Sequence, residues 1–192
     1  MNSINTITLK DLEHAKQVLL IEAAGLTKLS QSLNETLTNA LDIIQNIKGR
    51  VVVTGMGKSG HVAKKIAATL ASTGKLAFFI HPGEASHGDI GMIGRDDVVL
   101  ALSNSGETPE LHDIISYTRR FNIPLIGMTS QLSGTLALES DVSLILPSAE
   151  EACFIGLAPT TSTTMMMAYG DVLAVVLMQR QGFSAEDFKL RH

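Results

Sequence analysis

Cysteine, tryptophan and aromatic residues are scarce in this sequence, and each shortage excludes a class of protein. The one cysteine, Cys153, cannot form a disulfide within the chain or build a zinc site from cysteines, and it suits a reducing compartment. Tryptophan is absent and aromatic residues make up only 4%, too few for the stacking platforms that bind unpaired bases. The net charge of −4 provides no basic footprint, so we expect no nucleic-acid partner.

Targeting and membrane-spanning patterns are also lacking. Residues 1–17 have neither the basic start nor the apolar run of a signal peptide. The most apolar late stretch, 165–178, is shorter than the roughly 20 residues that cross a bilayer, and it contains Asp171. We therefore expect a cytoplasmic protein with no membrane partner.

What the chain does have is enough length and apolar content for one well-buried domain. Its 192 residues are 45% hydrophobic, which is typical of a globular chain, and no linker or repeat divides it. We expect a single domain made of N-terminal helices over 1–48, a core over 49–182 and a tail over 183–192. Apolar side chains at helical spacing predict the N-terminal helices, which Gly25 or the Ser30–Ser32 region could separate.

The core alternates short apolar runs with segments of helical pattern. Five runs rich in Val, Ile and Leu predict buried strands at 51–54, 76–80, 98–102, 124–128 and 142–146. Helices are predicted at 59–73, 109–121, 133–139 and 161–180. This alternation predicts a three-layer α/β/α sandwich around a five-stranded parallel sheet, a Rossmann-like or flavodoxin-like fold.

Ligands bind at the carboxyl ends of the strands in such sheets, so we expect function in four polar loops that follow predicted strands: "TGMGKSG", "HPGEASHGDIG", "SNSGETPE" and "PSAEEACFIGLAP". The glycine-rich loop "TGMGKSG" follows the first strand. It is not a Walker A motif, because Val52 occupies the position of the required first glycine. Gly55, Gly57 and Gly60 fit the dinucleotide fingerprint. However, His81 stands where that fingerprint needs an acidic residue to hold the ribose, so an NAD-dependent oxidoreductase is the least favoured interpretation.

Two features favour a phosphorylated small molecule instead. Lys58 lies in a first helical turn, where it opposes the helix dipole, and a bound anion would explain it. The segment "SNSGETPE" leaves a strand and enters a helix with Thr108 as N-cap and Pro109 at the first position. Hydroxyls, a permissive glycine and a helix N-terminus together suit a phosphate. We expect contacts from Ser103, Asn104, Ser105, Gly106 and Thr108.

Five segments, in order along the chain, carry a family resemblance: "GMGKSGHVAKKIAATLASTG", "HPGEASHGDIGMI", "SNSGETPE", "EEACFIGLAPTTSTT" and "GFSAEDFKLRH". Together they resemble the sugar isomerase (SIS) domain of D-arabinose 5-phosphate isomerases. Such enzymes interconvert D-ribulose 5-phosphate and D-arabinose 5-phosphate, the first step towards Kdo of the Gram-negative outer membrane. Most similar proteins continue into Pro-Gly-Gly and a pair of CBS domains, whereas this chain stops at His192.

The resemblance assigns catalysis to Lys58, Glu110, Glu151 and His192. Lys58 can stabilise negative charge that develops on oxygen, while Glu110 would be favoured by the dipole of its first helical turn without any catalytic role. We expect Glu151 to be the base that forms the enediol, with a pKa raised by partial burial, although Glu150 is a rival. His192 could open the sugar ring or relay a proton, in its own subunit or a neighbouring one.

The resemblance also implies substrate contacts from Ser59, Gly74, Lys75, His81 and His87. It makes His87 the position at which zinc can bind and inhibit. No cofactor is required, because one carboxylate can shuttle the proton. The family assembles as tetramers, so a homo-oligomer is implied, and the N-terminal helices and the methionines at 165–167 are candidates for its contacts.

A non-catalytic phosphosugar-binding regulatory module is the main alternative, since SIS domains also serve to bind effectors. Such a module would keep the phosphate loop but would not need all four catalytic positions. The pathway that an isomerase would serve stays open between lipopolysaccharide, capsule and sugar-alcohol metabolism.

Overall fold

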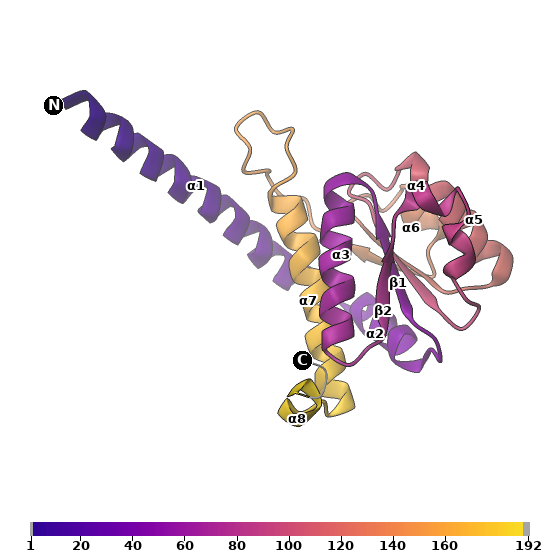
Figure 1. The fold of residues 1–192 in the computed structure, drawn as a ribbon. Helices are drawn as coiled ribbons and strands as arrows, with labels where there is room; N and C mark the ends of the chain where they lie inside the picture. Colours follow the sequence, from indigo (N-terminus) through magenta and orange to yellow (C-terminus); the bar gives the residue numbers. More distant parts are fainter. Residues whose placement is uncertain (1, 190–192) are drawn as a thin grey trace.

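The computed structural model describes residues 2–189 and contains a five-stranded parallel sheet between two helical layers (Figure 1). The strands are β1 (Val51–Gly55), β2 (Ala77–Ile80), β3 (Val98–Leu102), β4 (Leu125–Thr129) and β5 (Val142–Ile145). The helices and 3₁₀ turns are α1 (Asn2–Ser32), α2 (Glu35–Asn46), α3 (Gly57–Ser72), α4 (Pro82–Ala85), η1 (Asp89–Met92), η2 (Pro109–Leu111), α5 (His112–Phe121), α6 (Thr135–Glu139), α7 (Thr161–Gln181) and α8 (Ala185–Lys189). The predicted three-layer fold is confirmed.

The strands lie in the order β2-β1-β3-β4-β5 and all run parallel, so their carboxyl ends share one edge of the sheet. Every residue of β1, β3 and β4 is buried. Helices cover both faces of these central strands, which is why their sequences are continuous apolar runs without alternation.

Each face of the sheet has its own core. Val51 and Val53 of β1 pack towards the layer of α2, α3 and α7, whereas Val52 packs towards α4, α5 and α6. The alternation of side chains along a strand thus divides a single apolar run between two cores.

Helix α1 projects from this body in Figure 1. Its later turns pack on α7, but Leu9, Leu12 and Leu19 in its outer part are each more than half exposed. Gly25 lies buried inside the helix, which ends only at Ser32, so the serine region is the correct one of the two predicted boundaries. A helix with exposed leucines of this kind offers surface for contact with another chain.

Helix α7 is long and apolar enough to meet the length and composition criteria of a membrane span. The stretch 165–178 considered in the sequence is only the middle of this helix and is too short to meet them. Helix α7 packs along α3 and against α1 and α2, and half of its most apolar window is buried. The core therefore accounts for its apolar character.

Candidate functional site

The polar loops expected to carry function follow β1, β2, β3 and β5, and all four begin at the carboxyl edge of the sheet. A fifth polar loop, which follows β4 and starts with Ser130 and Gln131, joins them there. The parallel sheet thus gathers five short segments that are far apart in the sequence.

The glycine loop after β1 brings α3 close to the strand. A Cβ on Gly60 would lie 2.5 Å from the carbonyl oxygen of Gly55, so this spacing of glycines is explained by packing without any dinucleotide. Lys58 is exposed in the first turn of α3, and its ammonium has no hydrogen bond or ion pair within the described chain. Ser59 turns towards α7 instead, with its Oγ 3.7 Å from Sδ of Met166.

The predicted phosphate loop closes on itself through its hydroxyls. Ser103 is buried, and its Oγ lies 2.7 Å from Oγ1 of Thr108 and accepts the N–H of Gly106 at 3.0 Å. The Ser105 hydroxyl accepts the N–H of Glu107 at 3.2 Å. Thr108 is the N-cap residue of η2 as predicted, but its hydroxyl contacts Ser103 and caps no helix N–H. These hydroxyl and N–H groups lie where a helix begins, a favourable place for a phosphate.

The two glutamates of this segment, Glu107 and Glu110, have different surroundings. The carboxylate of Glu107 accepts the N–H of Thr135 at 2.6 Å and its hydroxyl at 2.8 Å, and it therefore holds the start of α6. These bonds lower the pKa of Glu107. Glu110 is exposed and lies in the 3₁₀ turn η2. It was expected in the first turn of the α-helix, but α5 begins only after η2 ends.

Glu151 lies after β5 and against the N-terminus of α7. Its Oε2 accepts the N–H of Thr160 at 2.7 Å, the hydroxyl of Thr160 at 2.9 Å and the N–H of Ser162 at 3.3 Å. The Thr160 hydroxyl in turn accepts the N–H of Ala152 at 2.8 Å. No hydrogen bond from residues 2–189 reaches Oε1.

The prediction that Glu151 has a raised pKa is wrong. Burial does raise the pKa, but the Ser162 side chain and the hydrogen bonds from Thr160 outweigh it, so the pKa lies below its ordinary value of 4.5. The Ser162 hydroxyl is buried beside this carboxylate and favours its ionised form, although its geometry falls short of a hydrogen bond. A carboxyl with a lowered pKa is ionised at neutral pH, which is the state that a proton-abstracting base requires.

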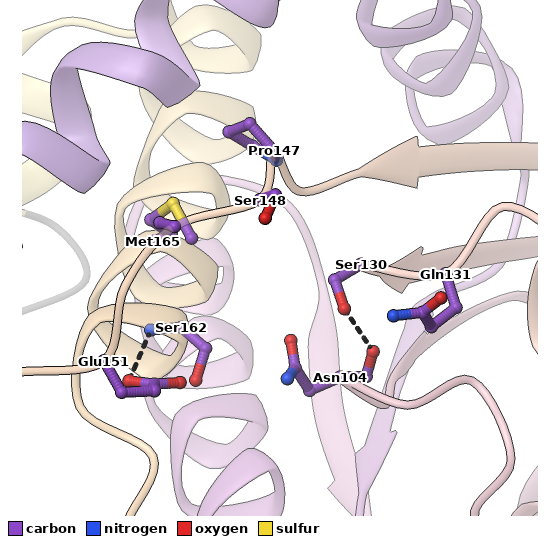
Figure 2. A pocket seen from close by; sticks show the side chains of 9 residues that line it. Asn104, Ser130, Gln131, Pro147, Ser148, Glu151, Ser162 and Met165 are labelled. Carbon is purple, nitrogen blue, oxygen red and sulfur yellow. Dashed lines mark hydrogen bonds between the residues drawn. The ribbon is translucent and has the colours of Figure 1, made fainter. Parts of the chain in front are cut away.

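A hollow of about 120 Å³ lies against this carboxylate (Figure 2). Glu151 and Ser162 border it from the side of α7, and Asn104 borders it from the loop after β3. The Ser130 hydroxyl donates to the Asn104 carbonyl oxygen at 2.7 Å and so fixes that loop. The remaining lining residues are Gln131, Pro147, Ser148, Ala149 and Met165.

Of the predicted site residues, Asn104 and Glu151 line this hollow, whereas Ser130 and Gln131 were not predicted. Ser130 and Gln131 directly follow the buried strand β4. A polar loop directly after a buried strand is the same pattern that predicted the loops after β1, β2, β3 and β5. Applying it to the fourth strand would have found Ser130 and Gln131.

The two histidines after β2 do not form a metal centre with their surroundings. Nδ1 of His81 accepts the N–H of Gly83 at 3.2 Å, which caps α4, while His87 is exposed before η1. Among the described residues, no three His, Cys, Asp or Glu side chains are grouped so that they could hold a metal ion. The donors of residues 2–189 therefore do not fit a zinc site with three protein ligands.

Gly74 and Lys75 lie at the opposite, amino edge of the sheet, between α3 and β2. A Cβ on Gly74 would lie 2.8 Å from the ring of Phe183, so this glycine allows the segment after α7 to pack there. Burial lowers the pKa of Lys75. Within one chain, Gly74 and Lys75 therefore do not reach the hollow that Glu151 and Asn104 line. The remaining predicted catalytic residue, His192, lies outside the described residues.

Comparison with known proteins identifies the family to which this fold belongs. The SIS domain family matches residues 43–176, well over half of the chain. The chain belongs to the SIS domain family. This SIS domain is 53% identical over 177 residues to the arabinose 5-phosphate isomerase KdsD of Yersinia pestis, a match that covers 92% of this chain and 54% of that protein. The KdsD of Escherichia coli K12 is 50% identical with the same coverage.

A solved structure resembles this SIS domain along its whole length. It is that of c3406 of E. coli CFT073 in complex with arabinose 5-phosphate, with a TM-score of 0.91, 38% identity and full coverage of both chains. By contrast, the chain spans about half the length of the curated KdsD relatives it matches.

Proposed function

We propose that this chain is an aldose–ketose isomerase that interconverts D-ribulose 5-phosphate and D-arabinose 5-phosphate through an enediol. The identity of 50–53% with arabinose 5-phosphate isomerases and the likeness to a protein solved with arabinose 5-phosphate support this assignment. The observation that carries it is the Glu151 carboxylate, ionised at neutral pH, at the edge of a hollow at the carboxyl side of the sheet.

The reaction needs a base, a stabilised oxyanion and a held phosphate. From the open-chain aldose, Glu151 takes the proton at C2 while the C1 carbonyl oxygen gains electron density and then a proton, which gives the enediol. Glu151 returns its proton to C1 as the hydroxyl on C2 loses one, which leaves the ketose. The substrate is isomerised with no net oxidation, so every electron and proton is accounted for within substrate and enzyme.

Lys58 and the phosphate loop complete the proposed site. Lys58 stabilises the oxygen on which charge develops, since its ammonium is exposed at the same sheet edge and is not used by another side chain of the described residues. The segment Ser103–Thr108 holds the phosphate at the start of η2. Glu110, exposed in η2 at this edge, would serve as a second acid or base. The proposal gives the opening of the sugar ring to His192, which lies outside the described residues.

The proposal also includes the pathway, the cellular compartment and the oligomeric state of the enzyme. The product would enter the synthesis of Kdo for lipopolysaccharide, as the resemblance to D-arabinose 5-phosphate isomerases implies. The lone cysteine and the acidic net charge suit a cytoplasmic enzyme. The exposed leucines of α1 suit a homo-oligomer, for which the family resemblance implies a tetramer.

Turnover of D-ribulose 5-phosphate, followed as formation of the aldose, tests the proposal with Lys58→Ala and Lys48→Ala as a matched pair. Lys48 is also exposed, but it precedes β1 at the opposite edge of the sheet. We expect Lys58→Ala to lower kcat by about 10²–10³-fold, as loss of an oxyanion-stabilising group does, and Lys48→Ala to leave it unchanged. Saturable binding of the sugar phosphate without turnover would favour the regulatory-module alternative and contradict the proposal.

A further inference from the structure

Glu151 is held through one side of its carboxylate, and Thr160 donates two of the three hydrogen bonds that hold it. The N–H and the hydroxyl of Thr160 lie 2.7 and 2.9 Å from Oε2. Because the hydroxyl also accepts the N–H of Ala152 at 2.8 Å, its proton has to point at Glu151. Thr160 therefore fixes the direction of this bond as well as its length.

The two carboxylate oxygens of Glu151 differ in the number of hydrogen bonds that they accept. Oε2 accepts three hydrogen bonds, whereas Oε1 accepts none from the described residues, and the side chain borders the hollow that Asn104 also lines. A base needs a lone pair that no donor occupies and a side chain whose orientation is fixed before the substrate arrives.

From this asymmetry we infer that Thr160 is a positioning residue for the isomerisation: by holding Oε2, it leaves Oε1 as the oxygen that takes the substrate proton and returns it. This inference rests on the proposed function. Thr160 itself acts through Glu151 and takes no part in the proton transfer.

Other titratable and charged groups near Glu151 come from two elements, α1 and the loop that follows β5. The groups that line a second hollow beside Glu151, of about 650 Å³, are His14 of α1 and Glu150 and Cys153 of the loop. Glu22 of α1 accepts the Thr164 hydroxyl at 3.3 Å, and Lys28 of α1 donates to the Ser148 carbonyl oxygen at 3.2 Å. None of them forms a hydrogen bond or ion pair with Glu151, so Thr160 and Ser162 are its hydrogen-bonding partners among residues 2–189.

A purely structural role would use the same contacts, since a carboxylate at a helix N-terminus also stabilises the helix. The two roles differ in what they change. A structural contact alters the stability of the fold but leaves kcat of the folded protein and the acid limb of its pH profile where they were. A positioning contact moves both of these quantities.

The test compares Thr160→Val and Thr160→Ser with Thr163→Val. Thr163 is the matched control, because its hydroxyl lies in the same helical turn but donates to the Thr160 carbonyl oxygen at 2.9 Å and not to Glu151. For each variant, kcat and KM for D-ribulose 5-phosphate are measured against pH. The carboxyl carbon of Glu151 is titrated by NMR in the ligand-free protein and assigned by its absence in Glu151→Gln.

We expect Thr160→Val to lower kcat by about 10²-fold at nearly constant KM, the usual cost of a misplaced reacting group. Loss of the hydroxyl should also raise the pKa of Glu151, which moves the acid limb of kcat/KM and the NMR titration to higher pH together. Thr160→Ser should restore both and Thr163→Val should change neither. If Thr160→Val does not fold by circular dichroism, Thr160→Ala takes its place.

An active wild type in which Thr160→Val keeps its kcat would overturn this inference and leave the proposed function standing. A wild type without turnover would overturn the proposed function, and the role of Thr160 in the reaction would fall with it. In that case the NMR titration would still report whether Thr160 holds the carboxylate.

Discussion

Asp97 and Glu151 are two carboxylates held by hydrogen bonds at opposite edges of the same sheet. Asp97 precedes β3 at the amino edge, where its Oδ1 accepts the Arg50 N–H at 2.7 Å and its Oδ2 accepts the Gly94 N–H at 2.8 Å. The Arg50 guanidinium also pairs with Oδ2 at 3.2 Å. Both oxygens of Asp97 are therefore occupied and its charge is matched by a cation, whereas Glu151 has one occupied oxygen and no cation bonded to it among the described residues.

This difference separates a carboxylate that ties the chain together from one that can react. Asp97 is almost fully buried and joins the segments before β1 and β3, so its bonds are of use only while the fold is intact. Glu151 has enough hydrogen bonds to stay ionised, but its Oε1 accepts none from the described residues and its side chain borders a hollow. Two occupied oxygens suit a structural carboxylate, whereas an unoccupied oxygen on a side chain beside a cavity suits the base that we propose.

The largest expected effect is on activity, from Glu151→Gln. The glutamine oxygen can still accept the Thr160 and Ser162 bonds, but the side chain can no longer take a proton. We expect kcat for D-ribulose 5-phosphate to fall by about 10²–10⁴-fold, the usual contribution of a general base, with little change in the melting temperature.

Glu150→Gln is the control for this substitution, because Glu150 is the neighbouring glutamate and was its rival in the sequence. Its kcat should stay near that of the wild type. If Glu150→Gln lost the activity and Glu151→Gln kept it, the assignment of the base would be reversed.

The corresponding change at the other edge, Asp97→Asn, should affect stability and not turnover. Asparagine keeps only one of the two oxygens as an acceptor. Either the Arg50 backbone N–H loses its partner, or the Gly94 N–H and the Arg50 guanidinium lose theirs together. We expect the free energy of unfolding in urea to fall by about 2–3 kcal/mol. The neighbouring exposed Asp96, changed to Asn, should unfold like the wild type, and kcat of folded Asp97→Asn should be normal. A marked loss of kcat in Asp97→Asn would break the contrast between the two edges.

Features that depend on burial could be predicted from the sequence, whereas features that depend on contacts between distant residues could not. The strands and the layers followed from continuous apolar runs, and their ends were placed within one residue, because burial on both faces leaves a direct trace in the sequence. The positions of Lys58 and Glu151 followed from the strand-end loops and the family resemblance. The lowered pKa of Glu151 could not be predicted, since it depends on the Ser162 side chain and on hydrogen bonds from Thr160, in a segment nine to eleven residues away that folds back beside the carboxylate. Gly74 and Lys75 were expected to contact the substrate, yet they precede β2 and therefore lie at the amino edge of the sheet, opposite the hollow.

The smallest expected effect is on the pH dependence of stability. Burial raises the pKa of Asp97, but the N–H groups of Gly94 and Arg50 and the Arg50 guanidinium lower it more, so in the folded chain it lies below the ordinary value of 3.8. Between the folded and the unfolded pKa the unfolded chain binds more protons, so the stability from Asp97 is complete above its ordinary pKa and is lost as the pH falls through the folded one.

Urea unfolding of wild type and Asp97→Asn at pH values from about 6 down to about 3 measures this contribution. The wild type should lose stability more steeply in the acid range, by at most about 1.4 kcal/mol per pH unit, because one carboxyl exchanges at most one proton. Glu151→Gln should also flatten the acid slope, since the pKa of Glu151 is lowered as well. Of the two variants Glu151→Gln and Asp97→Asn, only Glu151→Gln should lower kcat. Parallel acid slopes for wild type and Asp97→Asn would show that the bonds at Asp97 do not favour its ionised form.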